Sequence, residues 1–264
     1  MERAVSVLRG LHPRQNNEGA TLMFRAVFST LIFALLSVSN IFAAERAEFD
    51  LIGYSHGGKY FAFEEYGIQD GSGFAYSTIY VLSLENDAWV GGSPFHVQAG
   101  DETTQLAEIR SQALRAAMGP LGTYNISTPA RLIALNGDGE PESDELTLDF
   151  GVPGYSDPSS HFGSYELSFD IFSAPSGENC MDYFGDEAKG FRLKLSDGTT
   201  TSILHEDTRV PTSRGCPVTY RASAVVIPFD AYDIDHGVAL VSVWSYGFEG
   251  MDRRFIAVPL NKGN

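Results

Sequence analysis

Apolar residues between Glu45 and Asn264 fall mostly in short runs that have the length of β-strands and are rich in β-branched and aromatic side chains. Glycine, proline, aspartate and serine separate the runs. Some runs alternate strictly, as Tyr165, Leu167 and Phe169 do, which is typical of a strand with one face in a core and the other in water. The runs of this kind are KYFAFEEY, STIYVLSL, ARLIAL, ELTLDF, SYELSFDIF, GFRLKLS, TTSILHE, YRASAVVIPF, VALVSVWSY and RRFIAVPL. The pattern predicts a mainly β protein with antiparallel sheets.

One segment, DETTQLAEIRSQALRAAM, breaks this pattern. Its apolar residues recur every three or four positions, which is the spacing of one helical face. Asp101 is placed to cap the start of the helix, and Gly119-Pro120 to end it. The sequence therefore predicts a single inserted α-helix over about residues 101–118.

The elements together favour an antiparallel sandwich or barrel-like fold with this one inserted helix. A small propeller-like β fold is the alternative, because GYSHGGKYFAF is similar to the S-x-D-G-K-x-x-A-F turn of propeller blades. Gly57 stands at the aspartate position of that turn, and about a dozen strands are too few for four full blades. The sandwich or barrel is therefore the first choice.

The N-terminal 44 residues differ from the rest of the chain. Residues 23–44 have the features of a secretory signal peptide: Arg25 supplies the positive charge, Ala26–Leu36 the apolar core, and Ala43-Ala44 the small residues before cleavage. A membrane anchor is the alternative, but polar residues interrupt the apolar run, which is shorter than the roughly 20 residues that span a bilayer. We expect export to the periplasm of a Gram-negative envelope.

The domain organisation follows from this leader. Residues 1–22 are predicted to be a non-native extension, because Met23 opens the signal peptide. Residues 45–264 are predicted to form a single, mainly β secreted domain, without an integral membrane segment after signal cleavage and soluble.

The charge of the chain restricts its partners. The formal net charge is −16, and an acidic protein repels nucleic acid and anionic lipid headgroups. Nucleic acid is therefore excluded as a partner, whereas an unknown envelope protein or a small ligand remains open. No motif indicates a cofactor.

Cys180 and Cys216 are the two cysteines of the chain. Both lie in the part expected to be exported, and an oxidising compartment allows them to pair. The alternatives are a metal site, which needs more cysteines or histidines nearby, and two free thiols. We expect a disulfide.

The stretch GYSHGG fits the G-x-S-x-G pattern of a hydrolase nucleophile elbow. That elbow needs a helix after the serine, but a strand-like run follows Ser55. We interpret the stretch as a tight turn between two strands, with its glycines at positive φ. The histidines lack the spacing of a zinc site, and His205 and Asp207 are expected at a strand end that runs into a solvated turn.

The acidic stretch NGDGEPESDE partly matches an EF-hand calcium loop that starts at Ala134. Asn136, Asp138, Gly139 and Glu145 then occupy the third, fifth, sixth and twelfth positions. The first position, normally an aspartate, is alanine, and strand-like runs flank the loop. An acidic hairpin loop is favoured over a calcium site, and no metal ligand is assigned.

Two distant segments resemble each other. FAFEEYGIQDGSGFAYSTIYVLSL and ALVSVWSYGFEGMDRRFIAVPL each contain a strand, Tyr-Gly, a glycine-rich acidic turn and a second strand. We expect the two hairpins side by side, either as a binding surface on a rigid scaffold or because Arg253 or Arg254 pairs with an acidic residue of the first hairpin. The candidate binding residues are Glu64, Glu65, Asp70, Tyr76, Glu249, Asp252, Arg253 and Arg254.

FAFEEYGIQDGSGFAYSTIYV, DTRVPTSRGCPVTY and the closing GFEGMDRRFIAV resemble the domain-of-unknown-function 2259 family of predicted secreted bacterial proteins. The resemblance extends over nearly the whole exported part. It implies export and a shared fold, and it implies no activity and no catalytic residues.

The sequence contains no convincing catalytic constellation, so we expect a non-catalytic binding or envelope-associated module. The alternatives are a carboxylate-dependent hydrolase, for which two well-placed acidic residues suffice, and a calcium-binding β protein. A pocket that holds Glu64 or Asp70 close to a second buried carboxylate would favour the hydrolase.

Overall fold

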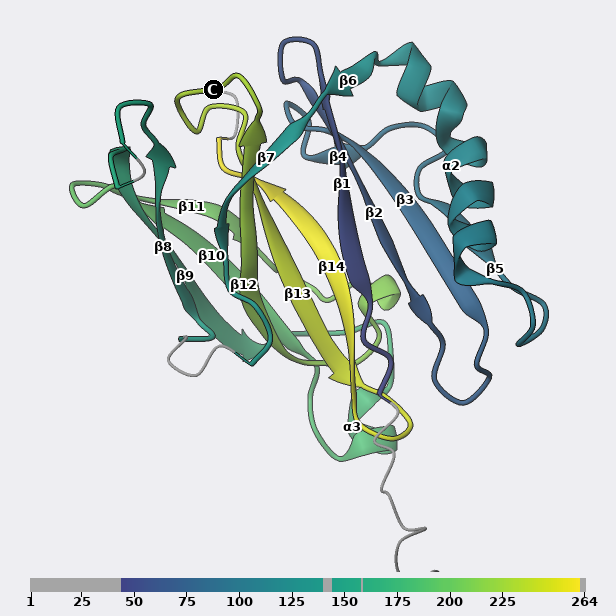
Figure 1. Cartoon of the computed structure of the whole chain (residues 1–264). Coiled ribbons are helices and arrows are strands. Elements are labelled where there is room, and N and C mark those ends of the chain that lie inside the picture. Colours follow the sequence, from purple (N-terminus) through teal and green to yellow (C-terminus); the bar gives the residue numbers. More distant parts are fainter. Residues whose placement is uncertain (1–43, 140–143, 158, 262–264) are drawn as a thin grey trace, which may run out of the picture. The chain divides into compact units, whose positions relative to one another are not determined.

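Each of the strand-like runs of the sequence forms a strand in the computed structural model, which describes residues 44–139, 144–157 and 159–261 (Figure 1). Three antiparallel sheets and one long helix contain most of these residues. The predicted extension, and the predicted signal peptide up to residue 43, lie outside the described residues. The mainly β prediction is confirmed.

The N-terminal sheet has the strand order β4-β3-β2-β1-β6, and β5 also pairs with β3. Three of its strands are short and were not expected from the sequence. The strands are β1 (Glu48–Ser55), β2 (Tyr60–Ile68), β3 (Ala75–Ser83), β4 (Ala88–Trp89), β5 (Phe95–Gln98) and β6 (Ile126–Thr128).

The central sheet has the order β14-β13-β12-β7, and the outer sheet has the order β11-β10-β9-β8. The central strands are β7 (Ala130–Leu135), β12 (Pro217–Pro228), β13 (Val238–Tyr246) and β14 (Met251–Pro259). The outer strands are β8 (Thr147–Pro153), β9 (His161–Ser173), β10 (Lys189–Ser196) and β11 (Thr201–Glu206). A short helix α3 (Cys180–Phe184) and a 3₁₀ turn (Thr212–Arg214) lie in the connections.

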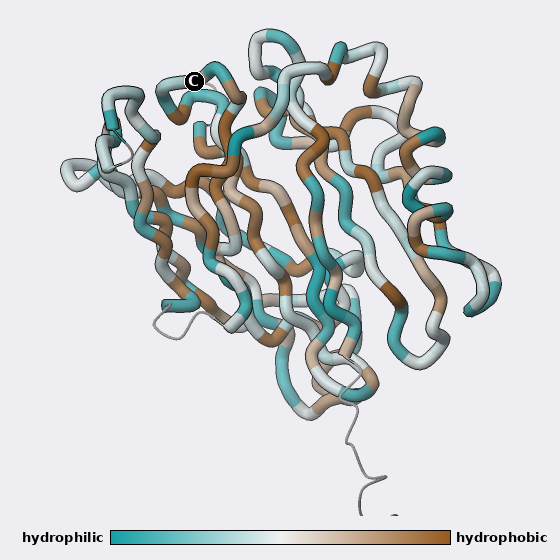
Figure 2. Tube along the Cα trace, in the orientation of Figure 1, coloured by the Kyte–Doolittle hydropathy of each residue, from teal (hydrophilic) through white to brown (hydrophobic). Residues whose placement is uncertain are grey.

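The central sheet is buried on both faces. Val225, Val241 and Val243 pack against the outer sheet in one core, whereas Val226 and Leu240 pack against the N-terminal sheet in a second core. Burial on both faces explains why β12 and β13 read as nearly continuous apolar runs rather than as alternating ones. Figure 2 shows hydrophobic positions concentrated along these strands. The sheets are stacked and not closed into a barrel, and they are not arranged as propeller blades.

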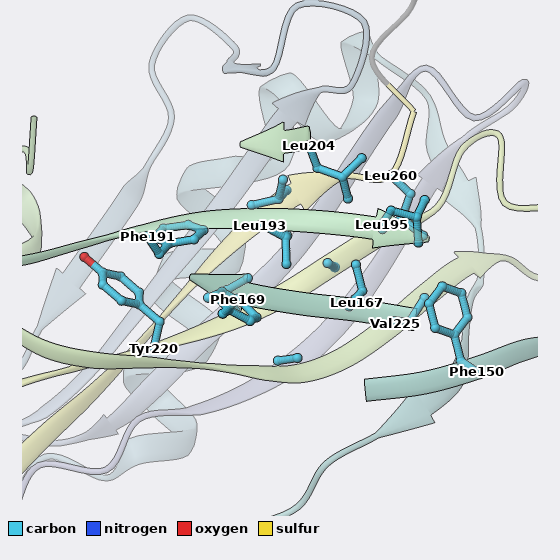
Figure 3. Close-up of a cluster of buried hydrophobic side chains, with 14 of the residues drawn as sticks. Phe150, Leu167, Phe169, Phe191, Leu193, Leu195, Leu204, Tyr220, Val225 and Leu260 are labelled. Carbon is cyan, nitrogen blue, oxygen red and sulfur yellow. The ribbon is translucent and has the colours of Figure 1, made fainter. Parts of the chain in front are cut away.

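The core between the central and outer sheets is rich in aromatic side chains (Figure 3). The ring of Phe191 in β10 lies 4.5 Å from that of Tyr220 and 5.5 Å from that of Phe169, between ring centroids. All three side chains are buried. Such pairs add to the free energy gained by burying their area.

The predicted inserted helix is confirmed as α2, which spans Leu106–Thr123 and therefore begins and ends about five residues later than the predicted limits of about 101 and 118. Asp101 does not cap the helix, because its carboxylate accepts hydrogen bonds from the main-chain N–H groups of Thr103 and Thr104 in a separate turn. The helix continues through Pro120. The residue before that proline is Gly119, whose missing Cβ removes much of the clash that usually excludes helical backbone there. Ala113 and Ala117 pack on the N-terminal sheet.

The turn predicted from GYSHGG is confirmed. In GYSHGG, Gly57 and Gly58 have φ values of +92° and +73°, and Ser55 Oγ accepts a hydrogen bond from Tyr60 N–H at 3.0 Å. The Ser55 C=O accepts a hydrogen bond from Gly58 N–H at 2.9 Å, which closes a β-turn between β1 and β2, and the Ser55 hydroxyl holds the start of β2 through its bond to Tyr60. Asp197 and Gly198 form the hairpin turn between β10 and β11.

The acidic loop after Asn136 joins two strands of different sheets and is not a hairpin. Asn136 accepts a hydrogen bond from Arg221 at 2.8 Å, and Asp138 lies 2.5 Å from Arg253 Nη1. Two candidate calcium ligands are therefore engaged with arginines. Residues 140–143 of the loop lie outside the described residues.

Cys180 and Cys216 form a disulfide, as predicted, and close a loop with a sequence separation of 36.

Reduction of the disulfide is expected to lower the free energy of unfolding by about 3 to 4 kcal/mol, because the open chain gains conformational freedom when it unfolds. Urea unfolding with and without reductant measures the difference. The Cys180→Ser/Cys216→Ser variant is the control, since it should match the reduced protein and not respond to reductant. Equal stability of the oxidised and reduced forms would contradict the prediction.

Candidate functional site

A cleft of about 640 Å³ runs along β14, the last strand of the central sheet. This volume is in the range of ligand sites. One wall comes from the N-terminal sheet and the other from the outer sheet and the 3₁₀ turn. The lining residues include Glu65, Tyr76, Thr78, Tyr80, Trp89, His96 and Gln98 on the first wall, His205, Pro211, Ser213 and Arg214 on the second, and Arg254–Val258 between them.

Glu65 is a buried carboxylate in the lining of the cleft. It lies two positions beyond Phe63 on the same face of β2, so the strand alternation that places Phe61 and Phe63 in the core also turns Glu65 inward. Its side chain is 2% exposed, and its Oε2 accepts a hydrogen bond from Phe255 N–H at 2.6 Å. Burial raises the pKa of Glu65 to about 7, although the neighbouring Arg254 charge acts in the opposite direction.

Arg254 joins the acidic residues of the cleft. Its guanidinium forms an ion pair with Glu45, lies 3.7 Å from Glu65 Oε1 through Nε, and donates a hydrogen bond to Tyr76 Oη at 2.7 Å. The guanidinium carbon also lies 4.8 Å from the centre of the Tyr76 ring. One cation therefore compensates two carboxylates that are both nearly inaccessible to water.

The opposite wall is built around Asp207. This buried carboxylate accepts hydrogen bonds from Phe191 N–H at 3.1 Å and from Arg214 Nη1 at 2.7 Å, and its Oδ1 lies 3.0 Å from His205 Nε2. Burial alone would raise the pKa of Asp207, but these three partners outweigh it and hold the pKa below its usual value. The expectation of a solvated turn was therefore wrong for Asp207, which fixes His205 and Arg214 at the cleft.

Aromatic rings cover the first wall. The ring of Tyr80 lies 4.8 Å from that of Phe63 and 5.4 Å from that of Trp89. His96 Nδ1 lies 2.8 Å from Thr78 Oγ1, which holds the imidazole beside Tyr76. Trp89 is 47% exposed, so an indole ring is free to contact a ligand at the mouth of the cleft.

A family model described as "Predicted secreted protein (DUF2259)" matches residues 62–261. The chain belongs to this family. No curated protein and no solved structure matches the chain significantly. The DUF2259 match covers β3 to β14 and most of β2, and it therefore includes both walls of the cleft.

The structure brings the two similar hairpins of the DUF2259 chain together. Glu65 and Tyr76, from β2 and β3, contact Arg254 and Phe255 of β14. Three of the candidate binding residues, Glu65, Tyr76 and Arg254, line the cleft. The ion pair between Arg254 and Glu65 also matches the structural pairing considered from the sequence.

The other candidate residues lie outside the cleft lining. Glu64 faces α2, where its carboxylate accepts two hydrogen bonds from Arg110. Arg253 is buried and contacts Glu48 and Asp138. Asp252 accepts a hydrogen bond from Glu45 N–H, and its pKa is raised, first by burial and then by the charges of Glu45 and Asp70. Glu249 is exposed at the tip of the turn.

Several cleft residues were not expected from the sequence: Glu45, Tyr80, Trp89, His96, His205 and Arg214. Trp89 and His96 lie on or beside the short strands that the apolar pattern did not reveal. Tyr80 follows Tyr76 and Thr78 at every second position of β3, so its side chain lies on the same face as theirs. This alternation could have identified Tyr80 from the sequence, because Tyr76 was already a candidate binding residue. The pattern of apolar residues did not indicate that His205 of β11 would line the same cleft as the residues of β3.

Neither a spanning helix nor a metal site is found in the described part of the chain. No helix there is long and apolar enough to cross a membrane. Over the same residues, no three side chains of the types His, Cys, Asp and Glu gather closely enough to hold a metal ion.

Glu65→Gln is expected to change how stability depends on pH. In the folded protein Glu65 keeps its proton up to a pKa of about 7, whereas in the unfolded chain it loses it near 4.5. Between pH 4.5 and about 7 the folded state therefore binds more protons than the unfolded chain. The contribution of Glu65 to the free energy of unfolding is fully present below pH 4.5 and is lost as the pH rises to about 7. Urea unfolding at a series of pH values should show the variant gaining stability relative to wild type across this window, by on the order of 3 kcal/mol. Parallel pH profiles for the two proteins would contradict the raised pKa.

Proposed function

We propose that this protein is a non-catalytic binding module that is exported to the periplasm, and that the cleft along β14 holds its ligand. The observation that carries the proposal is the cleft itself, in which the exposed ring of Trp89 and the partly exposed ring of Tyr80 face a fixed set of polar groups. Ligand sites commonly combine apolar walls with a few well-held polar groups. The ligand is a small molecule or a segment of an envelope protein.

The state of the carboxylates favours binding over hydrolysis. Glu45 and Glu65 share the Arg254 guanidinium, and Glu65 also accepts the Phe255 N–H. A nucleophile or general base has to present a free lone pair to the substrate. These side chains are instead directed to groups of the protein, which makes them structural supports of the cleft.

One observation favours the carboxylate-dependent hydrolase as a second candidate. The pKa of Glu65 is raised to about 7, which suits a group that gives and takes a proton near neutral pH. The Glu65→Gln variant distinguishes the two functions, because glutamine keeps the hydrogen-bond acceptor for Phe255 and removes the titrating proton. Unchanged ligand affinity in this variant supports a binding module. Turnover of glycoside or ester substrates that disappears in the variant would establish the hydrolase.

Binding in the cleft can be tested with a chemically diverse fragment library. Trp244 is buried and Trp89 is exposed in the cleft wall, so the Trp244→Phe variant reports the cleft through the fluorescence of Trp89. We expect the binding fragments to perturb Trp89 and to lose affinity in a Trp89→Ala variant. Fragments that bind elsewhere, or none that bind, would contradict the proposed site.

Export is tested by cell fractionation with a C-terminally tagged chain. We expect a shortened protein in the periplasmic fraction, with its N-terminus near Glu45. Recovery of the full-length chain in the cytoplasm would contradict export and leave the cleft proposal standing.

A further inference from the structure

The main chain of β14, rather than one of its faces, borders the cleft. Five consecutive residues, Arg254–Val258, line it. Successive side chains of a strand point to opposite faces, and here Phe255 and Val258 do belong to the two different cores on either side of the central sheet. Consecutive residues can line one cavity only if the edge of the strand faces it. β14 is the last strand of its sheet and leaves such an edge.

The first main-chain groups on this edge of β14, up to the N–H of Phe255, have hydrogen-bond partners within the protein. In an antiparallel pair, alternate residues direct both their N–H and C=O groups away from the partner strand. Arg253 N–H bonds to Glu45 C=O at 2.8 Å, and Arg253 C=O accepts from Ala47 N–H at 3.2 Å, so the odd-numbered residues point outward. Phe255 N–H bonds to Glu65 at 2.6 Å. The edge groups up to this point all have partners.

Beyond Phe255 N–H the partners end. Within the described ranges, no hydrogen-bond partner is found for the C=O of Phe255 or for the N–H and C=O of Ala257. Main-chain groups with little exposure to water are nearly always paired in folded proteins. Phe255 is 4% exposed and Ala257 is only partly exposed. These three groups therefore form a ready template for one more strand.

The chain itself shows that the edge accepts a strand. Arg46 forms a parallel bridge with Arg253, and the segment around it pairs with the first part of β14. This segment ends its pairing at Ala47, because β1 then joins the N-terminal sheet. The free groups of Phe255 and Ala257 lie on the same edge, and both residues line the cleft.

We propose that the cleft binds an extended peptide that pairs with the free edge of β14 as an added strand. This inference rests on the proposed binding function and specifies its ligand. Main-chain hydrogen bonds to Phe255 and Ala257 would supply part of the affinity, and alternate side chains would enter the cleft. Tyr80 and Trp89 on the first wall favour an aromatic or large aliphatic side chain at one of these positions.

The charges of the cleft restrict the peptide further. Arg254 and Arg214 are both paired with carboxylates of the protein, so neither is left to attract an acidic peptide. The chain as a whole carries a formal net charge of −16. The ligand is therefore a neutral or basic extended peptide.

The experiment uses a library of short linear peptides as the probe and Trp89 fluorescence as the readout. The best-binding peptide is then resynthesised with one main-chain N-methyl group at a time. Methylation should weaken binding by about tenfold at alternate positions and little at the positions between them, because only alternate N–H groups of an added strand face β14.

Ala257→Pro is the matching change in the protein. It removes the outward N–H of Ala257 and no hydrogen bond to β13, so the fold should tolerate it on an edge strand, which circular dichroism and thermal melting check. We expect peptide affinity to fall by about tenfold, whereas Ala257→Ser, which keeps the N–H, binds as wild type does. If Ala257→Pro does not fold, the series of N-methylated peptides alone decides whether the peptide pairs with β14.

The outcomes separate the two proposals. Peptides that perturb Trp89 but show no alternation on N-methylation would overturn strand pairing and leave the binding cleft intact. Strand pairing would also be overturned, and the binding cleft left intact, if fragments bind in the cleft while no library peptide binds even at about 1 mM. If neither fragments nor peptides perturb Trp89, both proposals are wrong.

Discussion

Replacing Arg254 by alanine is expected to lower the free energy of unfolding by about 3 to 5 kcal/mol near pH 7.5, because it leaves buried acidic groups without their counter-charge. The guanidinium is the common partner of Glu45, Glu65 and the Tyr76 hydroxyl. The loss should be smaller near pH 5, where Glu65 remains protonated in the folded state. Urea unfolding at the two pH values measures both effects.

Two further variants make this prediction specific. Arg192→Ala removes an arginine that pairs with Asp170 and Glu206 on the outer sheet, and it should lower the free energy of unfolding much less than Arg254→Ala, because water screens these pairs. Adding Glu65→Gln to Arg254→Ala should recover part of the lost stability, since the neutral amide needs no cation. An Arg254 variant as stable as the Arg192 variant would show that the cluster does not depend on this charge.

Phe191→Ala is expected to destabilise the protein by about 3 to 5 kcal/mol through the cavity that it leaves. The Phe191 side chain is fully buried and contacts Phe169 and Tyr220 between the central and outer sheets (Figure 3). Its main-chain N–H also holds Asp207 at the second wall of the cleft. Chemical denaturation gives the difference in stability.

Phe248→Ala is the matched control for this core substitution. Phe248 is 86% exposed in the turn between β13 and β14, so its loss should change the stability by less than about 0.5 kcal/mol. Equal effects of the two substitutions would contradict the assignment of Phe191 to the core.

The regular elements were largely predictable because their signals are local. Alternation and strand-length apolar runs identified the long strands, and the glycines of GYSHGG identified the turn between β1 and β2. The predicted limits of the helix were displaced because the residues at each end can adopt a second local structure. Asp101 closes a separate turn instead of capping the helix, and Gly119 allows the helix to continue through Pro120. The short strands β4 and β5 contain too few residues to show a period.

The cleft was only partly predictable. The likeness between two hairpins selected Glu65, Tyr76 and Arg254, which meet in the cleft. The same reasoning also selected Glu64, but alternation along β2 turns adjacent residues to opposite faces, so Glu64 reaches Arg110 on α2. The contribution of His205 and Arg214 depends on how the outer sheet stacks beside β14, which is a tertiary relation without a local signal.

Amide hydrogen exchange at Ala257, followed by NMR with and without the best-binding peptide, tests the strand-addition site most directly. In the free protein Ala257 should exchange faster than Phe255, whose N–H is bonded to Glu65, and faster than Val258, whose N–H faces β13. Saturating peptide should then slow exchange at Ala257 by at least about tenfold and leave Val258 unchanged. An Ala257 amide that is already as protected as its neighbours, or that stays unprotected when the peptide is bound, would contradict the account.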